Sequence, residues 1–417
     1  MKRRAFLALA GGLAVAPTAV LAAHKKSSPA KGSTAAKAGT AAKKQPAATK
    51  GSAKASARSA SKANLRAPVV SSNSHAPSGI IRTAPLPRPK FENWRRYELQ
   101  IRLTPGDGSA PLRTWIPVPM ESDWQRLDDM EWQGNFSHAA LKRDPESGLL
   151  SFVTDWQGAR NGAPEASLTL RMSTRQRLFD ITRRGLSLES EDSLTHSLQP
   201  FGPWPQDAIA DLAERIIGRI REPMPQAMAI YDWLVDHAGP NCAPGSAPEA
   251  INNTLCRSFD KTDKGEDAGL TGLFVALCRA TGIPARFVSG QRLGPSRQSP
   301  SLGVAGNAAS AQHCRAEFHA ANYGWVPVDP ADAARALLMD RGSLDSGTAQ
   351  ALKKRLFGFW EMNWVAYYNG DAVRLPQGPE QPLPWVTRPQ AASVERDGGL
   401  RLQPRPVFTM ETRPLEG

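Results

Sequence analysis

Acidic residues are absent from the first 91 positions of this 417-residue chain. Of its 52 Lys and Arg residues, 17 precede Glu92, the first acid, which leaves 35 basic against 39 acidic residues and a net charge of −4. The formal charge of +13 therefore belongs to the N-terminal part alone. A basic folded domain would indicate a nucleic-acid partner, and the rest of this chain has no such excess. We expect no nucleic-acid partner.

Long apolar runs are also absent, apart from MKRRAFLALAGGLAVAPTAVLA at the start. A basic head before a weakly apolar segment that ends in small residues is typical of a removable export signal. Arg3 and Arg4 resemble the pair of a twin-arginine signal. We therefore predict a signal peptide over residues 1–22, no transmembrane segment in the mature chain, and a location in the periplasm or at the cell surface.

Residues 23–90 are rich in Lys, Ala, Ser and Pro and contain almost nothing to bury, so we predict a disordered, self-repelling linker. After export, its charge would be attracted to the phosphates and carboxylates of an anionic envelope surface, and salt would weaken that attraction. A solubilising spacer is the other interpretation of the same composition.

Cysteine is scarce. The chain has four, and it contains no paired-cysteine zinc motif, nucleotide-binding loop or nucleic-acid module. We therefore expect no cofactor. In an oxidising compartment four cysteines allow up to two disulfides from three connectivities, and a link between Cys242 and Cys256 is one of the pairings.

Short alternating runs of apolar and polar residues fill positions 91–182, among them YELQIRL, RTWIPVP, LLSFVTDW and ASLTLRMS. Turn-forming stretches such as PGDGSAP and DPESG separate these runs. Period-two runs between turns predict strands, so we predict a small antiparallel β domain here.

The pattern changes near Pro205. DAIADLAERIIGRI and MPQAMAIYDWLVDHA have helical spacing, residues 266–281 predict a third helix, and PARFVSGQRL, QHCRAEFHAA and YGWVPVDPAD predict strands. Helices followed by strands make residues 205–338 an α+β domain. We expect residues 339–417 to form an extension that packs on this core, with a partly irregular tail.

Three blocks in this region, GLFVALCRATGIPARFVSG, HCRAEF and GWVPVDPAD, resemble the bacterial transglutaminase-like domain of the papain-like cysteine enzyme superfamily. The preceding β domain and the trailing RLFGFWEMNWVAYY also fit exported bacterial members of that family. The resemblance implies a catalytic Cys at the N-terminus of the core helix, a His on the following strand and an Asp after the next. A helix N-terminus and an imidazolium stabilise a thiolate, and a carboxylate orients the imidazole.

His313 and Asp329 match the His and Asp of the family, and sixteen residues across one tight turn can bring them together. The position of the family Cys is occupied by Asp267. Asp is a favourable helix N-cap, so this substitution preserves the fold while it removes the nucleophile. Two further positions depart from the family: Gly269 replaces a common Asp, and Arg315 replaces a Trp.

Cys256 is the alternative nucleophile, if the polar insert that follows it folds back towards the helix. Cys242 is a weaker candidate, and Cys278 and Cys314 are interpreted as buried structural thiols. Glu317 matches an acid of the family pattern, and we interpret it as a structural hydrogen-bond partner.

Three functions are compatible with these residues. The favoured one is a catalytically degenerate protein that binds a peptide or peptidoglycan-like ligand in the retained cleft. The second is an active thiol amidase, peptidase or amide-transfer enzyme that uses Cys256. The third is a Zn or Mn site made of Asp267, His313 and Asp329, although separated residues without a metal motif give it little support, so we expect no metal.

Overall fold

The structure is a computed structural model, which describes residues 78–81, 94–158, 162–180, 189–239, 247–257, 269–340 and 346–416, together with residues 242, 243 and 245. The predicted signal peptide, most of the predicted linker and position 267 lie outside these residues. No helix in the described part is long and apolar enough to cross a membrane.

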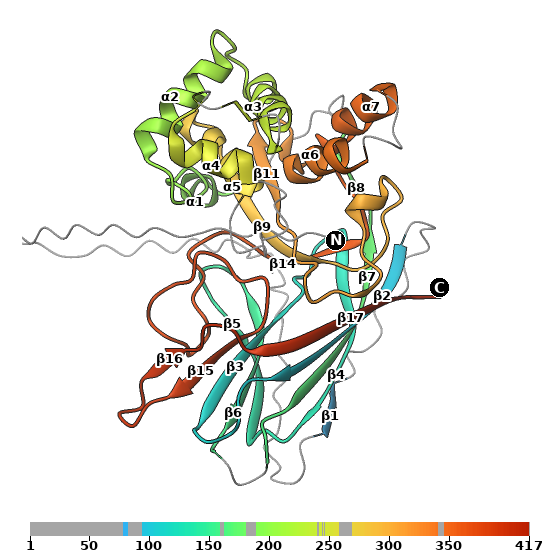
Figure 1. Cartoon of the computed structure of the whole chain (residues 1–417), viewed down its shortest axis with the longest axis vertical. Helices are drawn as coiled ribbons and strands as arrows, with labels where there is room; N and C mark the ends of the chain where they lie inside the picture. Colours follow the sequence, from blue (N-terminus) through green and yellow to red (C-terminus); the bar gives the residue numbers. More distant parts are fainter. Residues whose placement is uncertain are drawn as a thin grey trace, which may run out of the picture. The chain divides into compact units, whose positions relative to one another are not determined.

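Two antiparallel sheets form the β region that the alternating runs predict (Figure 1). The six-stranded sheet has the order β1 (Ser78–Ile81), β4 (Gln125–Gly134), β7 (Ala166–Arg175), β2 (Trp94–Thr104), β17 (Val407–Leu415) and β10 (Gly306–Asn307). The five-stranded sheet has the order β16 (Leu400–Leu402), β15 (Gln390–Val394), β3 (Leu112–Val118), β6 (Leu150–Trp156) and β5 (His138–Arg143). Strand β1 lies within the predicted linker, where the sequence indicated no strand.

One hydrophobic core joins these two sheets. Leu99 and Ile101 of β2 belong to the same buried cluster as Ile116 of β3 and Phe152 of β6. The side chains that reach this core are every second residue of each strand, as the pleat requires. The alternation therefore identifies the face of each sheet that reaches this core, while Trp115 and Val153, on the other face of the five-stranded sheet, are buried in a separate cluster.

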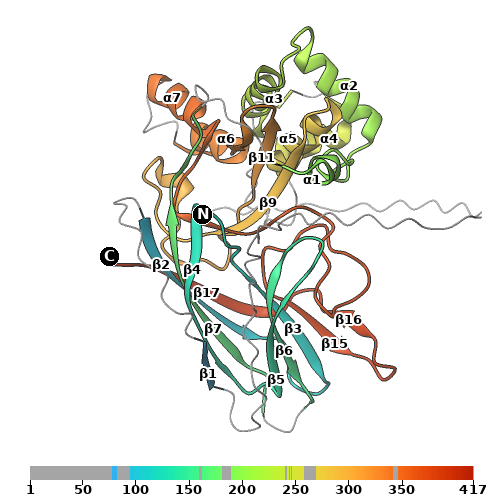
Figure 2. The same cartoon turned by 180° about the vertical axis from the view of Figure 1, so that it is seen from behind.

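The helical region contains a four-stranded antiparallel sheet. Its strands have the order β12 (Gly324–Val328), β11 (Arg315–Ala320), β9 (Ala285–Arg292) and β14 (Trp364–Asn369). Its helices are α1 (Glu191–His196), α2 (Gln206–Ile217), α3 (Pro223–His237), α4 (Glu249–Arg257), α5 (Gly269–Ala280), α6 (Pro330–Met339) and α7 (Ser346–Leu356). Both views show α2 to α5 grouped beside β9 and β11 (Figures 1 and 2), and the core helix α5 packs on these two strands.

The α+β prediction is confirmed, since helices precede the strands and every sheet is antiparallel. Two boundaries at the site differ. The strand predicted from Gln312 begins at Arg315, so His313 precedes it, and the strand predicted through residue 332 ends at Val328, because Pro330 fixes a helical φ and begins α6. The tight turn predicted between His313 and Asp329 is present, and both Asn322 and Gly324 in it have positive φ, at 67° and 76°.

The last part of the chain contributes strands to four sheets. Strand β14 is the fourth strand of the helical region, and β13 (Phe359–Trp360) pairs with β8 (Arg177–Leu178). The chain then returns to the β region, where β15 pairs with β3 and β17 pairs with β2 over nine residues. The C-terminal strands are thus integral to both regions.

Candidate active site

His313 lies just before β11, where backbone bonds fix its position. Its N–H donates to the carbonyl of Gly290 on β9 (3.1 Å), and its carbonyl accepts the indole N–H of Trp364 on β14 (2.8 Å). A Cβ atom at Gly290 would overlap the Trp364 ring, so the glycine allows the indole to reach this carbonyl. Two neighbouring strands therefore hold the histidine.

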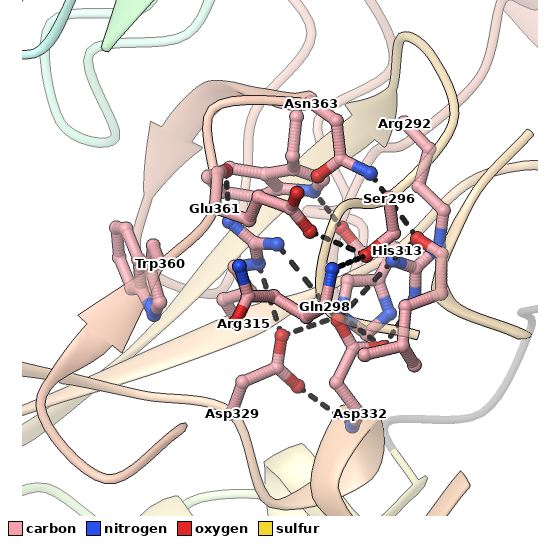
Figure 3. Close-up of polar contacts among 12 residues, drawn as sticks. Arg292, Ser296, Gln298, His313, Arg315, Asp329, Asp332, Trp360, Glu361 and Asn363 are labelled. Carbon is pink, nitrogen blue, oxygen red and sulfur yellow. Dashed lines mark hydrogen bonds and ion pairs between the residues drawn. The ribbon is translucent and has the colours of Figure 1, made fainter. Parts of the chain in front are cut away.

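Asp329 lies at the N-terminus of α6 and uses its two carboxylate oxygens for different partners. Oδ1 accepts the backbone N–H of Asp332 (2.9 Å), which caps the helix. Oδ2 lies 2.8 Å from Nε2 of His313 (Figure 3). The structure thus brings together the two residues that the sequence predicted as neighbours, and the helix cap fixes the carboxylate that orients the imidazole.

A second carboxylate and two arginines complete this cluster (Figure 3). Oδ1 of Asp332 lies 3.4 Å from Nε2 of His313. Arg315 donates from Nε to the same Oδ2 of Asp329 that contacts His313 (3.0 Å). Arg292 contacts both oxygens of Asp332. Each of these two carboxylate residues and two arginines is at most 8% exposed, so each charge depends on its partners for stabilisation.

The charges around Asp332 determine its protonation state. Burial raises the pKa of Asp332, but the positive charges of Arg292, His313 and Arg315 outweigh that effect and hold its pKa well below the usual range. Asp332 is therefore a carboxylate at every physiological pH.

His313, Asp329 and Asp332 also lie close enough together to be considered as metal ligands. The arginines argue against such a site, because Arg315 occupies the oxygen of Asp329 that faces His313, and Arg292 occupies both oxygens of Asp332. A divalent cation would have to displace two buried guanidinium groups. The donor set therefore does not suit a resident metal.

Glu361 connects this cluster to the loop that follows β9. Its carboxylate accepts the Ser296 hydroxyl and the Arg297 backbone N–H, both at 2.5 Å, and its carbonyl accepts Nη1 of Arg315 (3.1 Å). Burial raises the pKa of Glu361, and the hydrogen bond from Ser296 and the charge of Arg315 oppose this. The loop and the His313 cluster are thus joined through Arg315.

A family model described as the transglutaminase-like superfamily matches residues 210–330, which include α5, β9, His313 and Asp329. This segment is a transglutaminase-like domain. An uncharacterized protein of Haemophilus influenzae is 26% identical over 312 residues, which cover 70% of this chain and 82% of that protein.

The chain is also similar to two solved structures. One is a putative cysteine protease from Cytophaga hutchinsonii, with 14% identity, a TM-score of 0.47, and coverage of 78% of this chain and 92% of that chain. The other is the periplasmic domain of TgpA from Pseudomonas aeruginosa, with 17% identity, a TM-score of 0.29, and coverage of 61% and 98%.

The four cysteines of the chain all lie among the described residues. Cys242 and Cys256 form a disulfide, so Cys256 has no free thiol in this structure, and the alternative in which it is the nucleophile requires prior reduction. Cys278 is fully buried, which raises its pKa well above the ordinary value. Burial also raises the pKa of Cys314 to about 12. Neither free cysteine is a thiolate at neutral pH.

The transglutaminase-like domain places the first turn of α5 next to the histidine segment. The hydroxyl of Thr271 in this turn donates to the carbonyl of Cys314, the residue after His313 (3.2 Å). Asp267 precedes the helix by two residues and lies outside the described residues. Gly269 begins α5 with a φ of 54°, a conformation that disfavours the Asp usual in the family at this position.

Glu317 lies on the face of β11 that points away from α5, together with Arg315. It is 3% exposed and forms ion pairs with Arg177 and Arg286. The guanidinium of Arg177 stacks on Trp360 at 4.6 Å, and that of Arg286 stacks on Trp325 at 3.9 Å. These contacts agree with the structural role expected for Glu317.

The sequence did not single out Asp332, Arg292 or Glu361 as members of the site. A local pattern could have identified Asp332, because an acidic residue three positions after a helix N-cap often takes part in capping that helix. Arg292 and Glu361 come from β9 and from the loop before β14, so only the folded chain brings them to His313.

Proposed function

We propose that the protein is an exported, catalytically degenerate transglutaminase-like protein that binds a peptide or peptidoglycan-like ligand at the His313 site. The observation that carries the proposal is that none of the four cysteines supplies a thiolate to His313. Two are joined in a disulfide, and burial raises the pKa of the other two. A carboxylate at position 267 would attack an unactivated amide poorly compared with a thiolate.

The retained part of the site supports a binding role. His313 is 11% exposed at its side chain, and Nδ1 has no hydrogen-bonding partner among the residues described. Asp329 and Asp332 both contact Nε2 and so fix the ring orientation. A fixed imidazole with one nitrogen available can hydrogen-bond a ligand without any covalent step.

Two observations support export to the envelope. The disulfide between Cys242 and Cys256 is typical of an oxidising compartment. The N-terminal Arg pair precedes a short apolar segment, and the basic arm that follows would be attracted to anionic polymers of the envelope.

The first experiment maps thiol reactivity in the exported, folded protein by mass spectrometry after treatment with iodoacetamide or a reactive peptide-amide probe. We expect no cysteine that is labelled faster than an ordinary exposed thiol, before or after mild reduction. A His313→Ala variant is the matched control. Rapid labelling of Cys256 that disappears in His313→Ala would show an active thiol enzyme and overturn the proposal.

The second experiment measures ligand binding and turnover on the same preparation. Soluble peptidoglycan fragments are added to the wild-type protein and to His313→Ala, and release of products is followed by mass spectrometry. We expect binding that weakens in the variant and no product. Turnover that depends on His313 would contradict degeneracy, and absence of binding in both proteins would contradict the ligand class.

A further inference from the structure

A cavity of about 630 Å³ lies in the C-terminal part of the chain. It is lined by residues of two connections, Pro384–Gln390 leading into β15 and Pro404–Phe408 leading into β17. None of its lining residues belongs to the His313 cluster. A ligand in this cavity would therefore be bound independently of the site described above.

The walls of this cavity are conformationally restricted. Four of the lining residues are proline, whose rings fix φ, and two of them, Pro389 and Pro406, are buried. The first connection is anchored by the Val386 N–H, which donates to the Tyr368 hydroxyl (2.7 Å). A preformed wall reduces the entropy that a ligand must overcome.

Trp385 gives the cavity a fixed aromatic ring. The ring packs against Phe287 of β9 at a centroid distance of 5.8 Å, and Trp385 remains partly exposed. Two further apolar side chains line the cavity, Phe408 and Val407, and Val407 is 70% exposed. A ring that the fold holds from behind and leaves accessible can bind a ligand that presents a flat C–H face.

Thr387 provides a polar group that the fold leaves without a partner. The residue is 4% exposed and lines the cavity, yet its hydroxyl forms no hydrogen bond with another residue that the structure describes. By contrast, the buried hydroxyls of Thr114 and Thr154 bond to each other (2.6 Å), and that of Thr412 donates to the Leu293 carbonyl (2.6 Å). Leaving a buried hydroxyl without a partner costs free energy, so Thr387 indicates a hydrogen-bonding ligand.

The other polar groups of the cavity indicate a neutral ligand. Gln390 donates from Nε2 to the carbonyl of Arg388 (3.1 Å), which leaves its carbonyl oxygen as an acceptor for a ligand. The indole N–H of Trp385 is a donor, and it has no hydrogen-bonding partner within the described part of the chain. Arg388 and Arg405 have interaction partners of their own, and no lining residue is acidic. The available groups are therefore uncharged, and they include both donors and acceptors.

We propose that this cavity binds a neutral saccharide. The axial C–H face of a pyranose packs on Trp385. Because a sugar hydroxyl both donates and accepts, it pairs with the Thr387 hydroxyl and with the carbonyl oxygen of Gln390. A proline-rich peptide also presents rings to an indole, but proline has no N–H to donate to Gln390. The acceptor on Gln390 is the feature that favours the sugar.

The first test is calorimetric titration of the full mature protein with cellotetraose, a neutral β-1,4-linked tetramer of glucose. Hexaproline is the comparison ligand, because it offers rings and acceptors without donors. We expect cellotetraose to bind and hexaproline to bind at least about tenfold more weakly. Equal binding of hexaproline would overturn the saccharide assignment, and so would no binding of cellotetraose.

Variants locate the binding. Thr387→Val removes a hydroxyl that has no partner in the described chain, so the fold is retained, and we expect cellotetraose affinity to fall by about three- to tenfold. The matched control is Thr195→Val on α1, since Thr195 is exposed and does not line the cavity. Unchanged affinity in Thr387→Val, or equal losses in both variants, would overturn the assignment.

His313→Ala separates this proposal from the proposed function, because His313 does not line the cavity. We expect this variant to bind cellotetraose as tightly as the wild-type protein does. A loss of affinity in His313→Ala equal to that in Thr387→Val would place the saccharide outside this cavity and overturn the proposal.

Discussion

The indole of Trp364 donates a hydrogen bond to the carbonyl of His313 (2.8 Å). Trp364 lies on β14, outside residues 210–330 that the family model matches, so a strand outside the matched segment holds the histidine of the site. The same ring lies 4.6 Å from the guanidinium of Arg315, which contacts Asp329. Trp364 is 1% exposed and supports both members of the predicted pair. The transglutaminase-like domain therefore depends on β14 for the position of its imidazole.

Trp364→Phe tests this dependence. The variant keeps an aromatic ring but leaves the His313 carbonyl without its donor, so we expect the free energy of unfolding to fall by about 1–3 kcal/mol. Urea unfolding measures the change. Trp233→Phe on the partly exposed surface of α3 is the control, with an expected change below about 1 kcal/mol. Equal effects of the two substitutions would contradict a special role for Trp364.

Asp332→Asn probes the charge of the buried cluster. Folding lowers the pKa of Asp332. Ionised Asp332 therefore stabilises the folded protein above its pKa in the unfolded chain, about 3.8, and this contribution is lost as the pH falls from 3.8 towards the pKa in the folded protein. The variant leaves Arg292 unpaired, so we expect a loss of about 3–5 kcal/mol at pH 7.

The difference between wild type and Asp332→Asn should narrow below pH 3.8, as measured by urea unfolding across a pH series. Exposed Asp211 on α2 provides the control Asp211→Asn, which should change stability by about 0.5 kcal/mol or less. A difference that stays constant with pH would show that the shape of Asp332, and not its charge, stabilises the cluster.

Glu317→Gln removes the carboxylate shared by two arginines. Arg177 and Arg286 would lose their common partner in a site where Glu317 is 3% exposed, so we expect a loss of about 3–5 kcal/mol in thermal or urea unfolding. Glu131→Gln is the matched control, because the Glu131 side chain is 34% exposed and shares Arg171 with Glu98 and Asp129. The control should lose less than about 1 kcal/mol. Similar losses in both variants would contradict the buried pairing.

Reduction of the disulfide should lower stability. Cys242 and Cys256 are 14 residues apart, and closing a loop of this size contributes about 3 kcal/mol. We expect dithiothreitol to reduce the free energy of unfolding by roughly 2–4 kcal/mol in wild type and to have no effect on a Cys242→Ser/Cys256→Ser variant. Thiol titration of the denatured, unreduced protein should detect the two free cysteines alone, and detection of all four would refute the link.

Much of the site could be predicted because its main pair is local. His313 and Asp329 lie on either side of one hairpin, so their sixteen-residue spacing and the family pattern were sufficient to pair them. Arg315 was recognised as a departure from the family, but its contact with Asp329 became visible only in the folded chain. Arg292 and Glu361 approach from other elements, and no local pattern specifies such contacts.

In the fold, too, local elements could be predicted and contacts between distant elements could not. Periodicity predicted the strands β2, β3, β6, β7, β9, β11 and β12 and the helices α2, α3 and α5, and the α+β class followed from their order. Strands β15 and β17 lie in the segment expected to be an extension with a partly irregular tail, and even an alternating pattern would identify a strand without identifying its neighbour. Strand β10 is two residues long, which is too short for an alternating pattern to be recognised.

The pairing of β17 with β2 along nine residues has a practical consequence for anyone who divides this chain. A fragment that ends with the family match at residue 330 would leave β9 without β14 and both β2 and β3 without their C-terminal neighbours. Three unpaired strand edges favour aggregation. A fragment intended for expression should therefore run from β2 to β17, although the family model matches residues 210–330 alone.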